Sequence, residues 1–162
     1  QTPLTLLLDA DIELLPGIVK SLKDKLNNEN YQMVSVMAVL RFESFWEKLM
    51  MPAFVYFFKL IYPFKLANKP NSKFAAAAGG CILVETAALR NIGGMQAIQN
   101  KLIDDCALAQ ILKQSGYKTW LGLTHGVLSR RPFVDSAGIW DMVARTAFAP
   151  LFFSAALLFP VL

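Results

Sequence analysis

The chain opens with a short apolar run that ends at two carboxylates. Residues 5–8 are mostly leucine, and Asp9 and Asp11 follow directly. A continuous apolar run of this length predicts a strand that is buried on both faces of a sheet. Carboxylates at the end of a buried strand need a compensating charge. The pair therefore indicates either a site for a divalent cation or, for Asp11, the N-cap of a following helix.

A helical pattern and a second strand pattern follow this run. Apolar residues at helical spacing predict a helix over residues 14–26, with Pro16 in its first turn. Residues 32–42 are rich in valine and methionine and predict a strand. A strand–helix–strand unit implies a pair of parallel strands joined by a right-handed crossover.

Residues 44–64 form a nearly continuous apolar segment. Ser44 and Glu47 have the spacing of a capping box at its start. Its charge-free part, residues 49–58, has roughly half the length needed to span a bilayer. The segment therefore suits a helix at a membrane interface or a core helix of an α/β domain, and Pro52 is expected to kink or split it.

The remaining segments alternate between short strands and helices. A Gly79–Gly80 pair precedes a predicted strand over residues 82–84, and Asp104 and Asp105 open a predicted helix that ends before Gly116. The other expected elements are a helix over residues 85–91, strands over 117–123 and 127–131 on either side of His125, and a helix over 137–148. Residues 146–162 carry no charge and predict the start of a transmembrane helix.

The composition indicates contact with a membrane. Hydrophobic residues make up 55% of the 162 residues and charged residues only 17%. The net charge is +4, and Lys59, Lys65, Lys69 and Lys73 flank the apolar segment, which suits an anionic membrane face better than nucleic acid. The two cysteines form neither a zinc pattern nor a disulfide framework.

Three motifs stand in a fixed order along the chain: Asp9 with Asp11, the Gly79–Gly80 pair, and the Asp104–Asp105 pair. This order resembles the family-2 glycosyltransferases of the GT-A type, which transfer a sugar from a nucleotide diphosphate. Residues 41–47, 75–84 and 102–109 are most similar to the hopene-associated glycosyltransferases. Those are bacterial membrane enzymes related to ceramide glucosyltransferases.

The resemblance implies a role for each acidic motif. Asp9 and Asp11 would hold Mg²⁺ or Mn²⁺, which neutralises the charge that develops on the diphosphate leaving group. Asp105 would be the base that takes the proton of the acceptor hydroxyl, with Asp104 as its neighbour. A neighbouring negative charge raises the pKa of a carboxyl group and so favours proton uptake near neutral pH. For Asp104 and Asp105 the alternative is a plain N-cap.

Membrane-bound relatives carry a (Gln/Arg)-x-x-Arg-Trp motif before their membrane helices. Arg145 keeps the arginine of this motif, whereas Met142 and Thr146 replace the flanking residues. Trp140 would supply the aromatic side chain from one turn earlier. By resemblance, Arg145 contacts the donor diphosphate or the acceptor; the alternative is an arginine that snorkels at the membrane surface.

Four further residues are candidates for substrate or metal binding. Gly79 and Gly80 would let the substrate approach the backbone closely. Arg131 would bind either phosphate or anionic lipid. His125 would be a third metal ligand, as in some GT-A enzymes, or simply a solvated loop residue.

These expectations combine into an α/β fold. Residues 1–145 would form the C-terminal part of a GT-A domain with a mixed sheet and flanking helices, without its N-terminal nucleotide-binding half, and residues 146–162 a truncated transmembrane segment. The intact enzyme would move a sugar, with inversion, from a nucleotide-sugar donor to a lipid hydroxyl such as a hopanoid. It would act at the cytoplasmic face of a bacterial inner membrane, and this chain alone would be inactive. The alternatives are a ceramide, diacylglycerol or polyprenyl phosphate acceptor, or a non-catalytic membrane-anchored domain of the same shape.

Overall fold

The chain divides into two compact units, each of which is described by itself. The computed structural model describes residues 2–99, 104–133 and 136–148. Unit 1 consists of Gln1–Leu40 and Phe64–Arg130, and unit 2 of Arg41–Pro63 and Arg131–Leu162. The predicted transmembrane segment lies mostly outside the described residues, so its boundary at residue 146 stays a prediction.

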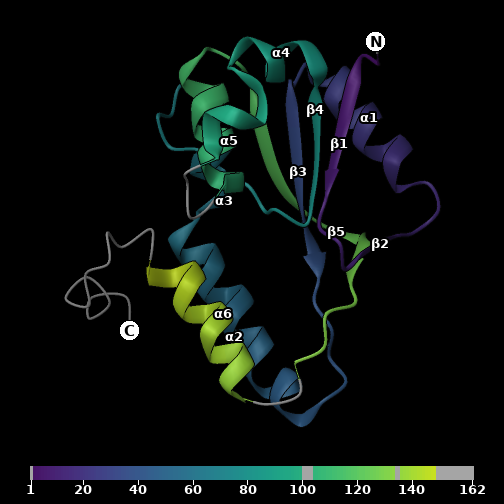
Figure 1. Ribbon diagram of the computed structural model, residues 1–162, viewed down its shortest axis with the longest axis vertical. Helices are drawn as coiled ribbons and strands as arrows, with labels where there is room; N and C mark the ends of the chain where they lie inside the picture. The colour runs from purple at the N-terminus through teal and green to yellow at the C-terminus, as the bar shows by residue number, and fades with distance from the viewer. Residues whose placement is uncertain (1, 100–103, 134–135, 149–162) are drawn as a thin grey trace. The chain divides into compact units, whose positions relative to one another are not determined.

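Unit 1 contains a five-stranded mixed sheet (Figure 1). Its strands lie in the order β1-β4-β3-β5-β2. Strands β3 and β5 are parallel, whereas the pairs β1–β4, β4–β3 and β5–β2 are antiparallel. The strands are β1 (Leu4–Leu8), β2 (Ile12–Leu14), β3 (Met33–Val39), β4 (Cys81–Glu85) and β5 (Thr119–Ser129). The predicted α/β class with a mixed sheet is therefore confirmed.

The surroundings of β1 differ from the prediction. Within the described residues β1 is an edge strand, and β4 lies between it and β3. Its side chains are only partly buried, and Leu8 is 43% exposed. The prediction of a strand buried on both faces is thus wrong. Strands β1 and β3 run in the same direction, as the strand–helix–strand pattern predicts, but β4 lies between them, so they do not pair directly. An apolar run predicts that a strand is buried, but it does not predict which later strand pairs with it.

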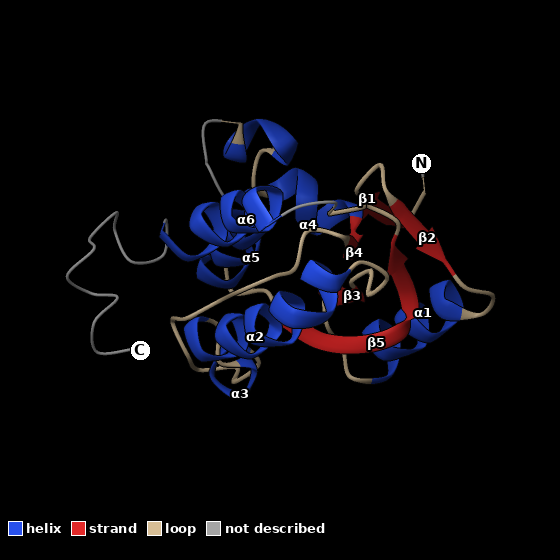
Figure 2. Ribbon diagram, turned by 90° about the horizontal axis from the view of Figure 1, so that it is seen from below, coloured by secondary structure: helices blue, strands red, loops and turns tan. Residues whose placement is uncertain are grey.

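Two hydrophobic cores cover the two faces of the sheet. Helix α1 (Ile18–Asn28) lies on one side of the strands, and α4 (Thr86–Asn91) and α5 (Asp104–Gln114) lie on the other (Figure 2). Successive residues of β3 and β4 alternate between these cores, as the pleat of a strand requires. The α1 core includes Leu22, Leu26, Val34, Cys81 and Leu83, and the α5 core includes Met33, Ile82, Val84, Leu108 and Leu112.

The start of α1 differs from the prediction as well. Residues 12–14 form β2, and α1 begins at Ile18 after Gly17, whose φ of 88° lies in the left-handed region. Pro16 therefore precedes the helix, and Asp11 is not its N-cap. The leucines that fit helical spacing also fit a short strand, and pairing with β5 decides between the two.

Two further predicted breaks are absent from the described structure. The two strands expected around His125 form the single strand β5. In unit 2, α2 (Phe45–Ile61) continues through Pro52 as one helix, so Pro52 does not split it.

The predicted capping box of Ser44 and Glu47 is confirmed at the start of α2. Helix α2 packs against α6 (Ser136–Phe148), and the short elements α3 (Phe64–Ala67) and η1 (Gly94–Ile98) complete the described fold.

Candidate active site

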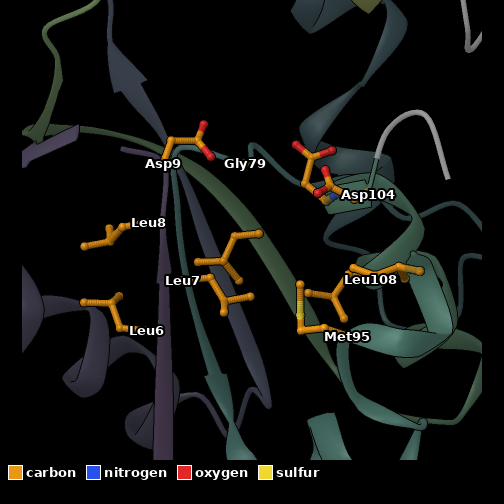
Figure 3. Close-up of a pocket in the computed structure, with 11 residues that line it drawn as sticks. Leu6, Leu7, Leu8, Asp9, Gly79, Met95, Asp104 and Leu108 are labelled. Atoms are coloured by element: carbon orange, nitrogen blue, oxygen red, sulfur yellow. The ribbon is translucent and has the colours of Figure 1, made fainter. Parts of the chain in front are cut away.

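A pocket in unit 1 brings together residues from three of the predicted motifs. Its volume is about 410 Å³, and Asp9, Gly79, Asp104 and Asp105 line its polar part. Asp9 and Asp104 lie at one end of the pocket, and apolar side chains line the rest of it (Figure 3). These apolar residues are Leu6, Leu7, Leu8, Ile82, Met95, Ile98 and Leu108. The pocket thus combines carboxylates with an apolar wall.

Antiparallel pairing explains why these distant segments meet. Leu8, the last residue of β1, pairs with Cys81, the first residue of β4. The next amide along the chain, that of Asp9, donates a hydrogen bond to the carbonyl of Gly80 at 3.4 Å. The end of β1 and the glycine pair before β4 are therefore neighbours, and the N-terminus of α5 supplies the remaining two carboxylates.

Asp105 is the half-buried carboxylate of the pocket. Burial raises its pKa to about 6, and the negative charges of Asp104 and Asp9 act in the same direction. The backbone amides of Cys106 and Gly79 act against this shift, and the Cys106 amide donates to Oδ1 of Asp105 at 2.7 Å. A carboxylate with a pKa near 6 can accept a proton at neutral pH and hold it better than an ordinary aspartate.

Asp104 is exposed and interacts locally. Its Oδ1 accepts a hydrogen bond from the backbone amide of Asp105 at 2.9 Å. A negative charge in the first turn of α5 is also favourable beside the helix dipole. The charge of Asp104 also contributes to the raised pKa of Asp105. Whether Asp104 acts as an N-cap stays a prediction, because residues 100–103 lie outside the described residues.

Asp11 does not line the pocket. Its Oδ2 accepts a hydrogen bond from the hydroxyl of Ser129 at 2.6 Å, and its carbonyl accepts one from the amide of Arg130 at 2.8 Å. Both partners lie at the end of β5. Asp11 is thus held against the sheet by two hydrogen bonds to residues more than 100 positions away, which no local sequence pattern predicts.

The residues available for a cation form an incomplete ligand set. Over the ranges that the structure describes, no three His, Cys, Asp or Glu side chains group closely enough to hold a metal ion. His125 is exposed on β5 and joins no such group with Asp9 and Asp11, so its role as a ligand stays a prediction. Two carboxylates fit Mg²⁺ or Mn²⁺ only where substrate phosphates supply further oxygens.

A family model described as glycosyl transferase family 21 matches residues 1–155 of the chain. The chain belongs to glycosyl transferase family 21. A comparison with curated proteins found no match.

Membership of family 21 identifies the protein as a glycosyltransferase. The family is similar to ceramide glucosyltransferases, and in general it moves sugar from a nucleotide-sugar donor to a lipid-like acceptor. The predicted relation to ceramide glucosyltransferases and the predicted enzyme class are therefore confirmed. The matching model is that of family 21 and not of the predicted family 2. The narrower resemblance to GT-A and hopene-associated enzymes stays a prediction.

Three predicted substrate-binding residues lie in unit 2 of this family-21 chain. Trp140 is exposed on α6 and lines a hollow of about 350 Å³ with Met50, Ala137 and Asp141. The guanidinium of Arg131 lies 5.5 Å from the ring centroid of Phe133. Arg145 belongs to α6, but its side chain is outside the described residues. Their roles stay predictions.

One helical stretch of the family-21 chain is a candidate for a membrane span. By length and composition, Phe45–Ala67 is the one described stretch that is long and apolar enough. The core helix of a soluble protein can meet the same criterion, but only 22% of this window is buried. The stretch is thus weak evidence for membrane association.

Proposed function

We propose that this protein transfers a sugar from a nucleotide-diphosphate donor to a lipid hydroxyl, with Asp105 as the catalytic base. The observation that carries the proposal is the position of Asp105, half-buried in the pocket that Asp9 and Gly79 also line. Its raised pKa of about 6 suits proton transfer near neutral pH.

The chemistry assigned to Asp105 is a direct displacement. The acceptor hydroxyl oxygen attacks the anomeric carbon while its proton passes to the carboxylate of Asp105. The bond between the anomeric carbon and the diphosphate oxygen breaks, and the nucleoside diphosphate leaves with the bonding electrons. One base suffices for this reaction, and the configuration at the anomeric carbon inverts.

Asp9 and Asp11 are proposed to hold Mg²⁺ or Mn²⁺ together with the donor diphosphate. When bound, the ion supplies positive charge to the leaving group. Asp9 is exposed at the pocket and can reach a ligand there. Asp11 is oriented by the hydroxyl of Ser129.

The apolar wall of the pocket supports a lipid-like acceptor. Leu7, Met95 and Leu108 lie farther along the pocket than the carboxylates (Figure 3). A hydroxyl at the end of an apolar group can therefore approach Asp105 while the apolar part contacts these residues. A hopanoid is the proposed acceptor, with ceramide, diacylglycerol and polyprenyl phosphate as the alternatives. The proposed location is the cytoplasmic face of a bacterial inner membrane.

The test is sugar transfer by the intact enzyme with Asp105→Asn and Asp11→Asn. We expect Asp105→Asn to lose at least about 10²-fold in rate, the lower end of what a positioned base contributes. Asp11→Asn should also lose sugar transfer, because it removes a proposed ligand of the ion that neutralises the leaving group. Asp105→Asn should still bind the nucleoside diphosphate in the presence of Mg²⁺ or Mn²⁺. Asp24→Asn, at an exposed position of α1, is the control. Transfer by Asp105→Asn within tenfold of the wild type would refute the role of this residue, and mass spectrometry of the lipid product identifies the acceptor.

A further inference from the structure

Helix α2 carries two apolar stripes on opposite sides. Met51, Phe54 and Phe58 form the buried stripe. The second stripe is exposed, with exposed fractions from 48% to 71%, and consists of Phe45, Leu49, Tyr56 and Leu60. Successive members of this exposed stripe are four, seven and four residues apart, so they follow one line along the helix.

An outward apolar stripe of this kind is unusual for a helix that is surrounded by water. A surface helix of a water-soluble protein normally places polar residues on the side away from its core. Contiguous apolar surface marks a site for a partner or a membrane. We therefore expect the exposed stripe of α2 to bind a partner or a membrane.

The charges on α2 indicate what that partner is. Lys48 and Lys59 are both exposed and lie eleven residues apart, which is three helical turns, so they border the stripe on one side. The single carboxylate of α2, Glu47, is buried and accepts hydrogen bonds from backbone amides. The exposed side of α2 is thus apolar and basic, which complements a bilayer with anionic headgroups.

We propose that the exposed stripe of α2 docks onto an anionic bilayer surface, with the helix axis along the membrane plane. Phe45, Leu49, Tyr56 and Leu60 enter the boundary between headgroups and acyl chains, and Lys48 and Lys59 extend to the lipid phosphates. This inference rests on the proposed function, because a lipid acceptor lies in such a bilayer. The inference identifies the surface of the protein that contacts this bilayer.

A fluorescent label on the stripe tests the docking in the full chain. Tyr56→Cys is labelled with an environment-sensitive thiol dye in a Cys106→Ser background. Cys81 can stay, because it is buried and burial raises its pKa to about 11, so it reacts slowly. Vesicles of phosphatidylcholine with phosphatidylglycerol should shift the emission to the blue, more than phosphatidylcholine alone. The same label at Val19→Cys, an exposed position of α1 in unit 1, should not shift.

Paired variants separate the apolar from the electrostatic contribution. Leu49→Ser with Leu60→Ser should weaken binding to the anionic vesicles by about tenfold or more, because two apolar side chains no longer enter the bilayer. Lys48→Gln with Lys59→Gln should mainly remove the preference for anionic over neutral vesicles. Val19→Ser with Leu123→Ser removes two exposed apolar side chains from unit 1 and should change neither.

Three results would overturn the inference. The first is an unshifted Tyr56 label when anionic vesicles are added to the otherwise unchanged stripe. The second is unchanged binding of the leucine pair, or a loss of binding in the control pair that equals the loss in the leucine pair. A blue shift that grows with protein concentration without vesicles would assign the stripe to a second copy of the chain. Sugar transfer to a detergent-solubilised acceptor should persist in the leucine pair, so failure of the docking and failure of the proposed function are distinguishable.

Discussion

The backbone of Gly79 lies against the carboxylate of Asp105. A Cβ atom placed on Gly79 would be 3.2 Å from Oδ2 of Asp105, and the Gly79 amide lowers the pKa that burial raises. Glycine is therefore favoured at this position because the Asp105 carboxylate lies close to the backbone, and not because the backbone conformation is unusual. Gly79 and Asp105 are 26 residues apart in the chain, and only the fold shows that they touch.

Gly79→Ala should impair sugar transfer with little loss of stability. The new methyl group is closer to Asp105 than most such contacts allow, so the carboxylate must move away from its position in the pocket. Displacing a catalytic group by a fraction of an ångström is expected to reduce the rate by about 10-fold or more. The measurement is the rate of sugar transfer, with thermal unfolding as the check on folding. Gly80→Ala is the control, because its methyl group would meet Ile12 instead.

Asp105→Asn should change how stability depends on pH. The pKa of Asp105 in the folded state, about 6, is above its ordinary value of 3.8. The folded state therefore prefers the neutral form, and this contribution is complete below about pH 4 and is lost as the pH rises through 6. A raised pKa of this size corresponds to about 1–3 kcal/mol for a half-buried group. The asparagine side chain stays neutral at every pH, so the variant should be more stable than the wild type at pH 8 and lose less stability between pH 4 and pH 8.

Denaturant unfolding at several pH values checks this prediction. The difference in the free energy of unfolding between variant and wild type should grow as the pH rises from 4 to 8. The exposed Asp24→Asn variant should follow the wild type over the same range. Parallel curves for Asp105→Asn and the wild type would show that burial does not disfavour the ionised carboxylate.

Ser129→Ala should weaken the binding of a nucleoside diphosphate in the presence of metal. The Ser129 hydroxyl donates to Oδ2 of Asp11 at 2.6 Å and so orients a proposed metal ligand. Loss of such a supporting hydrogen bond commonly reduces metal affinity by about 10–100-fold. Titration calorimetry with Mn²⁺ and the nucleoside diphosphate measures the effect, and Ser129→Thr, which keeps a hydroxyl, should bind better than Ser129→Ala. Equal affinity in Ser129→Ala and the wild type would contradict the orienting role.

Glu47→Gln should destabilise unit 2. The Glu47 carboxylate is buried and accepts hydrogen bonds from the amides of Glu43 and Ser44 at 2.8 Å and from that of Phe133 at 2.9 Å. An amide has one acceptor oxygen, so the variant leaves at least one buried donor unpaired, at a cost of about 1–3 kcal/mol. Hydrogen exchange should accelerate in α2 and α6 but not in α1. Glu43→Gln, at an exposed position, is the control.

Local sequence patterns were sufficient to predict the features that depend on nearby residues. The Ser44–Glu47 capping box, the start of α5 at Asp104 and its end before Gly116 all follow from local hydrogen bonding and backbone geometry. The α/β class followed from periodicity in the same way. The order of the three acidic and glycine motifs indicated a glycosyltransferase, which the family match confirms.

Contacts between residues that are distant in the chain could be found only in the folded protein. The β1 run could be read as a central strand until β4, from the middle of the chain, was seen at its side. The partner of Asp11 is Ser129, which is 118 residues away, and no local pattern links them. Both stripes of α2 are apolar, so composition does not tell the buried one from the exposed one. Strand pairing and side-chain packing bring together residues that are distant in the chain, and a local sequence pattern does not predict which residues these are.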